Sequence, residues 1–480
     1  MRTQSLNTLV QQSGVAFGTS GARGLVADMS DGLCWAYTSA FLQSVAPDAT
    51  RVVLGHDLRP SSPRISAACA AAITASGRSC IYVGALPTPA LAFYAAQLGA
   101  PAIVVTGSHI PFDRNGIKFY RADGEISKAD EQAMLDAQVE VPETVVNAVL
   151  PAPDARASAA YVQRYLDYFG AGALTGTRVA VYEHSSVGRD VLRTILQSLG
   201  AQVTSLGRTE TFVPIDTEAV RPEDVAKARQ WATEYSFDAL LSTDGDADRP
   251  LIGDERGEWL RGDVVGILCA QALQAQVVVT PVSSNTAVEL CGAFAQVLRT
   301  RIGSPYVIAG IDEALAQRTQ LTGPVVGYEA NGGFLLGSEV LQGGRSLQAL
   351  PTRDAVLPML ALLVMARQRG CKLSALGADL PKRFTSSDRL QAFATDKSRA
   401  LLAQLQTDAA GMAQILAPDS GAVTGTNQTD GLRVSFANGD IVHLRPSGNA
   451  PELRCYAEAE SAERAKRLCD ACLERVAAGV

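Results

Sequence analysis

The chain has 480 residues, of which 47% are hydrophobic and 19% are charged. This balance is typical of a globular protein and excludes a disordered one, and the length predicts about three to four domains. The formal net charge is −7, so the chain has no overall positive field that would favour nucleic acid or an anionic membrane as a partner.

We expect a cytoplasmic protein without a membrane segment. The first 14 residues lack the apolar core of a signal peptide, and the longest apolar run, residues 356–366, is too short to span a bilayer. The nine cysteines are odd in number and widely scattered, which argues against a disulfide framework. Cys469 and Cys472 form a C-x-x-C pair, but the helical spacing of the apolar residues around them places both thiols on the buried face of a helix.

The first segment, residues 1–150, alternates predicted strands and helices, a pattern that favours a doubly wound α/β sheet. It contains the glycine-rich stretch AFGTSGARGLV at residues 16–26. Glycines let backbone amides approach an anion, and the guanidinium of Arg23 can bind phosphate. A stretch rich in proline and valine, residues 141–153, is the predicted linker to the next segment.

An apolar strand at residues 102–105 leads into the loop TGSHIPFDRNGIKFY, residues 106–120. This loop presents a hydroxyl, an imidazole and an ammonium beyond the carboxyl end of a strand: Ser108, His109 and Lys118. In open α/β sheets this is the edge at which ligands bind. Ordinary polar turns have a similar composition, so the loop alone does not establish a site.

A second α/β unit is predicted over residues 155–256. Its last apolar strand runs into the loop TDGDADRP, residues 243–250, in which three carboxylates alternate with small residues: Asp244, Asp246 and Asp248. Alternation on an extended loop puts them on one side, where they repel one another unless they bind a hard cation. The run also resembles the start of an EF-hand loop, but Arg249 stands where that loop needs glycine and a strand precedes it.

The third α/β unit, residues 257–370, is predicted to end in a helix over residues 353–369. Its strand VVGYE runs into ANGGF, where Glu329 and Asn331 can hydrogen-bond the hydroxyl groups of a sugar. These residue types also suit a capped turn.

The last segment, residues 371–480, differs from the first three. Alternating short strands, with Asn438 and Gly439 at a hairpin turn, predict a smaller α+β domain. Its loop RPSGNAPELR offers two guanidiniums, a hydroxyl, an amide and backbone N–H groups, from Arg445, Ser447, Gly448, Asn449 and Arg454. Such an inventory can hold a phosphate firmly without reacting with it.

Together, these loops resemble the four motifs of the α-D-phosphohexomutase family. The serine loop T-x-S-H-N-P…N-G-x-K matches residues 106–118, the metal loop D-G-D-A/G-D-R matches residues 244–249, and the phosphate loop R-P-S-G-T-E-P…R matches residues 445–454. The sugar loop, G-E-x-S-G in many members, is GYEANGG in this chain, and FGTSGARG resembles the arginine loop of the family. Four motifs in order at domain-sized separations make the resemblance specific, and it covers nearly the whole chain.

The resemblance implies three similar doubly wound α/β domains and a smaller α+β domain, arranged around a central cleft. It also implies an enzyme that interconverts hexose 6-phosphate and hexose 1-phosphate through a phosphoserine and a hexose 1,6-bisphosphate. The loops look most like those of phosphomannomutases, and phosphoglucomutase or dual specificity is the alternative. A phosphoglucosamine mutase is less favoured, because GTSG stands where GTDG is typical of that branch. Monomer and homodimer stay open.

The resemblance further implies roles for individual residues. Ser108 would carry the phosphate, and Mg²⁺ would be held by that phosphate with the carboxylates of Asp244, Asp246 and Asp248. Lys118 and Arg23 would supply the acid–base and charge-stabilising groups, with His109 in support; a lysine base would need a lowered pKa, which neighbouring cations can supply. The remaining predicted ligands of the substrate are Arg249, Glu329, Asn331, Arg445, Ser447, Gly448, Asn449 and Arg454.

Three features of the loops depart from the family pattern. Ile110 replaces an asparagine beside the histidine, Asn449 and Ala450 replace Thr-Glu in the phosphate loop, and GYEANGG replaces the commoner sugar loop. Two other hypotheses compete with the mutase. A strand followed by D-x-D also marks phosphatases with an aspartate nucleophile. The other hypothesis is a non-catalytic relative that binds sugar phosphates, although the retained Ser108 and Lys118 argue against it.

Overall fold

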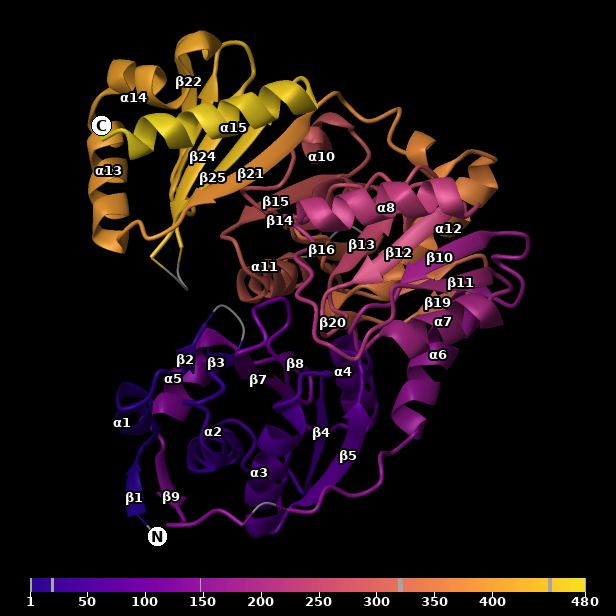
Figure 1. Cartoon of the computed structure of the whole chain (residues 1–480), viewed down its shortest axis with the longest axis vertical. Coiled ribbons are helices and arrows are strands. Elements are labelled where there is room, and N and C mark those ends of the chain that lie inside the picture. The colour runs from indigo at the N-terminus through magenta and orange to yellow at the C-terminus, as the bar shows by residue number, and fades with distance from the viewer. Residues whose placement is uncertain (1, 19–20, 147, 318–322, 448–450, 480) are drawn as a thin grey trace.

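The computed structural model describes residues 2–18, 21–146, 148–317, 323–447 and 451–479. In Figure 1 the N-terminal and C-terminal units occupy the two ends of the long axis, and the second and third units lie between them. The predicted fold class, three α/β units followed by an α+β unit, is confirmed. Among the described helices, none has the length and apolar character needed to cross a membrane.

The first unit is built on a mixed sheet in the order β2-β3-β7-β6-β4-β5, with β8 paired to β7. Its central strand is apolar and fully buried, which suits a strand covered by helices on both faces. The strands are β2 (Ala16–Phe17), β3 (Ala22–Leu25), β4 (Arg51–His56), β5 (Ser79–Ala85), β6 (Ala102–Val105), β7 (Arg114–Arg121) and β8 (Gly124–Glu125). The helices are α1 (Leu6–Gln11), α2 (Asp31–Ser44), α3 (Ser62–Ala75), α4 (Thr88–Gln97) and α5 (Lys128–Asp136); β1 (Arg2–Ser5) pairs with β9 (Gln138–Val141).

The second unit has a smaller sheet in the order β11-β10-β12-β13, in which only the last strand is antiparallel. Its strands are β10 (Arg178–Tyr182), β11 (Gln202–Leu206), β12 (Ala239–Thr243) and β13 (Pro250–Gly253), and its helices are α6 (Arg156–Phe169), α7 (Arg189–Ser198) and α8 (Pro222–Glu234). The predicted metal loop is the short connection between β12 and β13.

The third unit contains a sheet in the order β15-β14-β16-β17-β20 and a separate hairpin. Its strands are β14 (Val277–Pro281), β15 (Gln296–Thr300), β16 (Val325–Tyr328), β17 (Phe334–Leu336), β18 (Val340–Gln342), β19 (Arg345–Leu347) and β20 (Leu350–Asp354), and its helices are α9 (Gly262–Ala272), α10 (Ala287–Leu290), α11 (Ser304–Ala316) and α12 (Val356–Arg369). The prediction of a helix from residue 353 onward is wrong at its start, because Arg353 and Asp354 belong to a strand that pairs with β17.

The fourth unit has an antiparallel sheet in the order β21-β25-β24-β23-β22. Its strands are β21 (Phe384–Leu390), β22 (Val423–Asn427), β23 (Leu432–Phe436), β24 (Ile441–Pro446) and β25 (Leu453–Ala459), and its helices are α13 (Thr395–Thr407), α14 (Ala409–Leu416) and α15 (Ala462–Ala477), with short 3₁₀ turns η1 (Leu373–Ala375) and η2 (Pro418–Ser420) nearby. Gly439 has a φ of 88° at the predicted turn. Cys469 and Cys472 are fully buried on α15, which confirms their predicted place on its buried face.

One apolar core runs through the first three units, whereas the fourth has its own. The shared core includes Leu91 of the first unit, Leu241 of the second and Leu360 of the third. The separate core is formed by residues between 393 and 476. The first three units are therefore joined by apolar packing, and the fourth adjoins them through polar contacts such as the bond from the Ile302 N–H to Asp430 Oδ2 (2.9 Å).

Strand β20 of the third unit links that unit to the first and second units through neighbouring side chains. The Thr352 hydroxyl donates to Glu125 Oε1 of the first unit at 2.9 Å. Asp354 accepts from the hydroxyl groups of Tyr161 (2.7 Å) and Tyr165, both on α6 of the second unit. A buried carboxylate is costly unless donors satisfy it, so Asp354 fixes α6 against β20.

Replacing Tyr161 with phenylalanine removes one donor from the buried Asp354 carboxylate. We expect the variant to lose about 1.5–3 kcal/mol of stability, the usual contribution of a hydrogen bond to a charged group. Thermal or urea unfolding measures the loss. Tyr168→Phe is the matched control, because the Tyr168 hydroxyl donates to Gln342, an exposed residue. Equal losses in the two variants would contradict the role given to Asp354.

Candidate functional site

The loop between β12 and β13 brings three aspartates together in the interior. Asp244, Asp246 and Asp248 are each at most 1% exposed, and one carboxylate oxygen from each lies within 4.8 Å of the others. The loop closes on itself, because the N–H groups of Asp248 and Arg249 donate to Asp244 Oδ1 at 3.2 and 3.3 Å. Burial, with the charges of Asp246 and Asp248, raises the pKa of Asp244 well above its ordinary value.

The serine loop of the first unit lies directly against this cluster. The Ser108 hydroxyl donates to Asp244 Oδ2 at 2.6 Å, and its oxygen is 3.2 Å from His109 Nδ1. Ser108 is 1% exposed and has a left-handed φ of 53°, which is uncommon for a residue other than glycine. The structure thus joins the two predicted loops, although more than a hundred residues separate them in the sequence.

Arg59 holds the serine loop in place, a role that the sequence did not reveal. Its guanidinium is fully buried, is bound to Asp57, and lies 4.0 Å from the centre of the Phe212 ring of the second unit. It donates to four carbonyl oxygens of the loop, those of Ser108 (2.9 Å), Ile110 (2.5 Å), Pro111 (2.7 Å) and Arg114 (2.9 Å). Arg59 binds the backbone carbonyl of Ile110, and nothing in the structure explains why the side chain at this position is isoleucine.

Lys118 on β7 is bound to the aspartates. Its Nζ lies 2.6 Å from Asp246 Oδ2 and 2.8 Å from Asp248 Oδ2. Burial acts to lower the pKa of Lys118, but the two carboxylates outweigh it and raise the pKa above its ordinary value. The neighbouring cation Arg353 also acts to lower the pKa of this lysine, as expected, but the carboxylates outweigh it, and in this arrangement Lys118 is a charged donor.

Arg353 of β20 is a second cation, beside Lys118, that binds the aspartate cluster. The sequence alone does not reveal it. Its Nη2 lies 2.8 Å from Asp248 Oδ2, and its Nη1 lies 3.2 Å from Glu329 Oε2 in the predicted sugar loop. Asn331, in the same loop, accepts the Gly333 N–H with its side-chain oxygen at 2.9 Å. Glu329 is thus close to the cluster, and Asn331 shapes the loop that carries it.

Arg23, His109 and Arg249 add polar and charged groups beside the aspartates. Burial, followed by the charges of Arg249 and Arg353, lowers the pKa of Arg23 to about 10. Burial and Arg249 hold the pKa of His109 well below its ordinary value. Arg249 Nη1 donates to His109 Nδ1 at 2.8 Å, so this ring nitrogen is an acceptor and the imidazole is neutral.

The predicted phosphate loop lies in the fourth unit, and Gly448 and Asn449 are outside the described residues. Arg445 Nε is 2.8 Å from Asp430 Oδ2, and Arg454 Nη2 is 3.7 Å from Glu452 Oε2. The Ser447 N–H donates to the Glu452 carbonyl at 2.8 Å. Within the described ranges, no hydrogen bond or ion pair joins Arg445 or Arg454 to the aspartate cluster.

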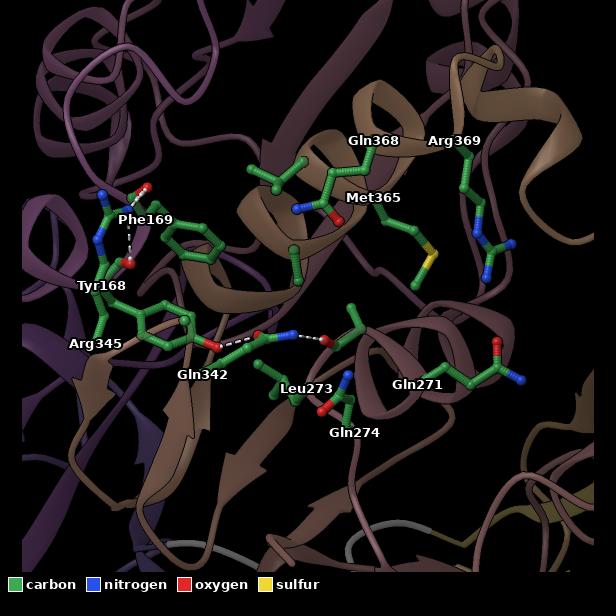
Figure 2. A pocket seen from close by; sticks show the side chains of 14 residues that line it. Tyr168, Phe169, Gln271, Leu273, Gln274, Gln342, Arg345, Met365, Gln368 and Arg369 are labelled. Carbon is green, nitrogen blue, oxygen red and sulfur yellow. Dashed lines mark hydrogen bonds between the residues drawn. The ribbon is translucent and has the colours of Figure 1, made fainter.

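A cavity of about 400 Å³ lies away from these loops, between α6, the region of α9, the β18–β19 hairpin and α12. Figure 2 shows Tyr168, Gln342 and Met365 on its walls, with the Tyr168 hydroxyl bonded to Gln342. None of the predicted site residues lines it. This cavity is therefore not the candidate site, because the residues that could bind a metal and carry a phosphate lie at the aspartate cluster.

The aspartates fit a divalent cation. The Oδ2 atoms of Asp246 and Asp248 accept hydrogen bonds from protein donors, whereas the Oδ1 atoms of both are buried and have no hydrogen-bond partner among the described residues. Buried carboxylate oxygens without donors are costly, and three carboxylates are the hard oxygen ligands that Mg²⁺ prefers.

Four family models match the chain in order. They are phosphoglucomutase/phosphomannomutase alpha/beta/alpha domain I over residues 14–143, domain II over 159–257, domain III over 261–384, and the C-terminal domain over 394–475. The chain belongs to the phosphoglucomutase/phosphomannomutase family. The predicted family and the predicted enzyme class, a phosphohexomutase, are confirmed.

Individual relatives agree with this assignment. The chain is 46% identical to a phosphomannomutase of Salmonella muenchen over 98% of this chain and 97% of the relative. It shares its fold with a putative phosphomannomutase of Thermus thermophilus (TM-score 0.75, 20% identity, 97% and 99% of the two chains). It also resembles the Aspergillus fumigatus N-acetylphosphoglucosamine mutase solved with GlcNAc-6P and magnesium (TM-score 0.57, 16% identity, 99% and 98% of the two chains).

The buried His184 makes stability at this site depend on pH. Its Nε2 bonds to the carbonyl of Thr243, which precedes the metal loop, at 2.9 Å, and burial lowers its pKa from 6.5 to about 4. Between these values the unfolded chain binds a proton that the folded chain does not, so stability falls as the pH falls. The contribution is at most about 3 kcal/mol.

His184→Gln keeps a side-chain donor but removes the titrating group. We expect the loss of thermal stability between about pH 7 and about pH 5 to be smaller in this variant than in the parent chain. Unfolding midpoints at both pH values measure the difference. An identical pH-dependent loss in both proteins would show that His184 is not the group responsible.

Proposed function

We propose that this chain is a phosphomannomutase that interconverts mannose 6-phosphate and mannose 1-phosphate, with Ser108 as the phosphate carrier. One observation carries the chemistry: a buried serine hydroxyl lies 2.6 Å from a cluster of three aspartates that fits a divalent cation. The near full-length similarity to a phosphomannomutase supports mannose as the sugar. Phosphoglucomutase activity, alone or in addition, is the alternative, because the same site chemistry serves both sugars.

The phosphoryl group moves between Ser108 Oγ and a sugar hydroxyl in both directions. As the bond from phosphorus to the serine oxygen breaks, the bond to the sugar oxygen forms; the sugar hydroxyl loses a proton, and the serine oxygen regains one. The resulting 1,6-bisphosphate then returns its other phosphoryl group to Ser108 after changing orientation. Lys118, Arg23 and His109 are our candidates for acid–base and charge-stabilising groups, and the first two bring positive charge to the transferring group.

Asp244, Asp246 and Asp248, with the phosphate on Ser108, would hold Mg²⁺. When bound, the ion polarises the phosphoryl group and neutralises its charge, which is most of what phosphoryl transfer requires. The three aspartates are already buried close together, and the Oδ1 atoms of Asp246 and Asp248 have no hydrogen-bond partner among the described residues. Ser108 itself is held toward Asp244 by the turn that Arg59 fixes.

The two ends of the substrate need different partners. We assign the ring hydroxyl groups to Glu329 and Asn331, near the cluster, with Arg249 as a further contact. We assign the phosphate that does not react to Arg445, Ser447, Gly448, Asn449 and Arg454 in the fourth unit. Since no hydrogen bond or ion pair among the described residues joins Arg445 or Arg454 to the aspartates, the substrate itself would connect the two sides.

The aspartate-nucleophile phosphatase is the less favoured hypothesis. Asp244, the first aspartate after the strand, accepts the Ser108 hydroxyl with Oδ2 and two backbone N–H groups with Oδ1. A serine hydroxyl thus lies 2.6 Å from the aspartate that such a phosphatase would use as its nucleophile, and the match to the mutase family supports the serine as the phosphate carrier.

A side-by-side assay of mannose, glucose and glucosamine 1-phosphates, with a 1,6-bisphosphate primer and Mg²⁺, tests the proposal. We expect the highest kcat/KM with mannose 1-phosphate and loss of all mutase turnover in Ser108→Ala. Full activity of Ser108→Ala would contradict the serine mechanism, and a preference for glucose 1-phosphate would overturn the sugar assignment. Binding without turnover of any sugar would favour the non-catalytic hypothesis.

Asp246→Ala should lower kcat on the order of 10² or more, because the aspartates hold the charge that stabilises the transition state. Asp123→Ala, at an exposed carboxylate of the first unit, is the control and should leave kcat unchanged. A loss of less than about threefold in Asp246→Ala would show that this loop is not the metal site.

A further inference from the structure

We propose that Arg353 and Gly333 act as a unit that positions the sugar loop of the third unit against the metal loop of the second. This inference rests on the proposed function, since it gives the two residues a task in the same site. Arg353 is a positioning residue: it orients the carboxylates of Asp248 and Glu329, and those carboxylates contact the metal and the sugar.

The guanidinium of Arg353 joins two loops from different units. Its Nε and Nη2 donate to Asp248 Oδ2 at 3.1 and 2.8 Å, and its Nη1 donates to Glu329 Oε2 at 3.2 Å. The side chain is only 2% exposed. The planar fork of donors suits this double contact, which a lysine could make only as a single point charge.

The contact also decides which oxygen of Asp248 is left for a cation. Oδ2 accepts from both Arg353 and Lys118, whereas Oδ1 is buried without a hydrogen-bond partner among the described residues. Groups that hold the second oxygen of a ligating carboxylate orient it and affect metal affinity by about 10–100-fold. Arg353 therefore ties the orientation of a metal-loop carboxylate to the position of Glu329.

Gly333 makes room for this arginine. A Cβ atom at residue 333 would lie 2.6 Å from Cδ and 2.9 Å from Cγ of Arg353, and 3.0 Å from Asn331 Oδ1. These contacts are shorter than packed atoms tolerate. The middle of the arginine side chain cannot easily move away, because its backbone is in β20 and its head group is bound at two carboxylates. The last glycine of GYEANGG, Gly333, is thus explained by an arginine later in the chain.

A purely structural arginine would give a different pattern from a positioning one. Removing a structural group lowers stability but leaves the metal affinity and KM of the folded protein unchanged. Removing a positioning group weakens both, because Asp248 and Glu329 are no longer held for the metal and the sugar. A shared function also predicts that changes at the two residues are not additive, since each acts through the same contact.

The test compares Arg353→Ala, Gly333→Ala and the double variant by calorimetric titration of the metal-free protein with MgCl₂, and by kcat and KM for mannose 1-phosphate. We expect each single variant to weaken Mg²⁺ binding about 10–100-fold and to raise KM. The double variant should be no weaker than Arg353→Ala, because a methyl group at residue 333 then meets no arginine. Gly377→Ala is the matched control, since its Cβ would be 3.9 Å from its nearest neighbours.

Two further variants keep the test decisive. Arg353→Lys should restore only part of the Mg²⁺ affinity, and Arg353→Gln, which keeps the bulk beside Gly333, replaces the alanine variant if thermal unfolding shows that the latter does not fold. Unchanged Mg²⁺ affinity and KM in the folded Arg353 variants, or additive losses in the double variant, would overturn the proposal. A parent chain that binds Mg²⁺ but lacks mutase activity would instead contradict the proposed function, so the two failures are distinguishable.

Discussion

The mutual repulsion of three buried carboxylates is the constraint on which the rest of this structure depends. Asp244, Asp246 and Asp248 cannot remain together in the interior without donors and cations around them. Their own loop supplies Arg249 and two backbone N–H groups. The other partners are Ser108, Lys118 and Thr88 of the first unit and Arg353 of the third. The cluster is therefore complete only when three units are packed together.

The same requirement explains why the first three units share one apolar core and the fourth does not. Groups that must meet to within hydrogen-bond distance need a rigid frame, and β20 provides part of it by contacting the first unit through Thr352 and the second through Asp354. The arginines of the phosphate loop have no such contact with the cluster among the described residues. A separately packed unit suits the role that we propose for this loop, which is to bind the end of the substrate that does not react.

Sequence reasoning found the groups that are close together in the chain. The alternation of aspartates after an apolar strand and the hydroxyl and ammonium of the serine loop were visible, because each motif is local and its composition is unusual. Arg59 and Arg353 were not recognised as site residues, since each acts on loops about fifty or a hundred residues away. The local sequence pattern also predicts a helix that includes Arg353, but pairing with β17, a tertiary effect, overrides that pattern.

We infer that Ser108, held against the aspartate cluster, carries the phosphoryl group. Peptide mapping by mass spectrometry of the protein after incubation with a hexose 1,6-bisphosphate and Mg²⁺ tests it most directly. We expect one phosphate per chain, on Ser108, and an excess of hexose monophosphate should remove it. Phosphate on Asp244 or elsewhere in a protein that turns over substrate, with Ser108 unmodified, would contradict it.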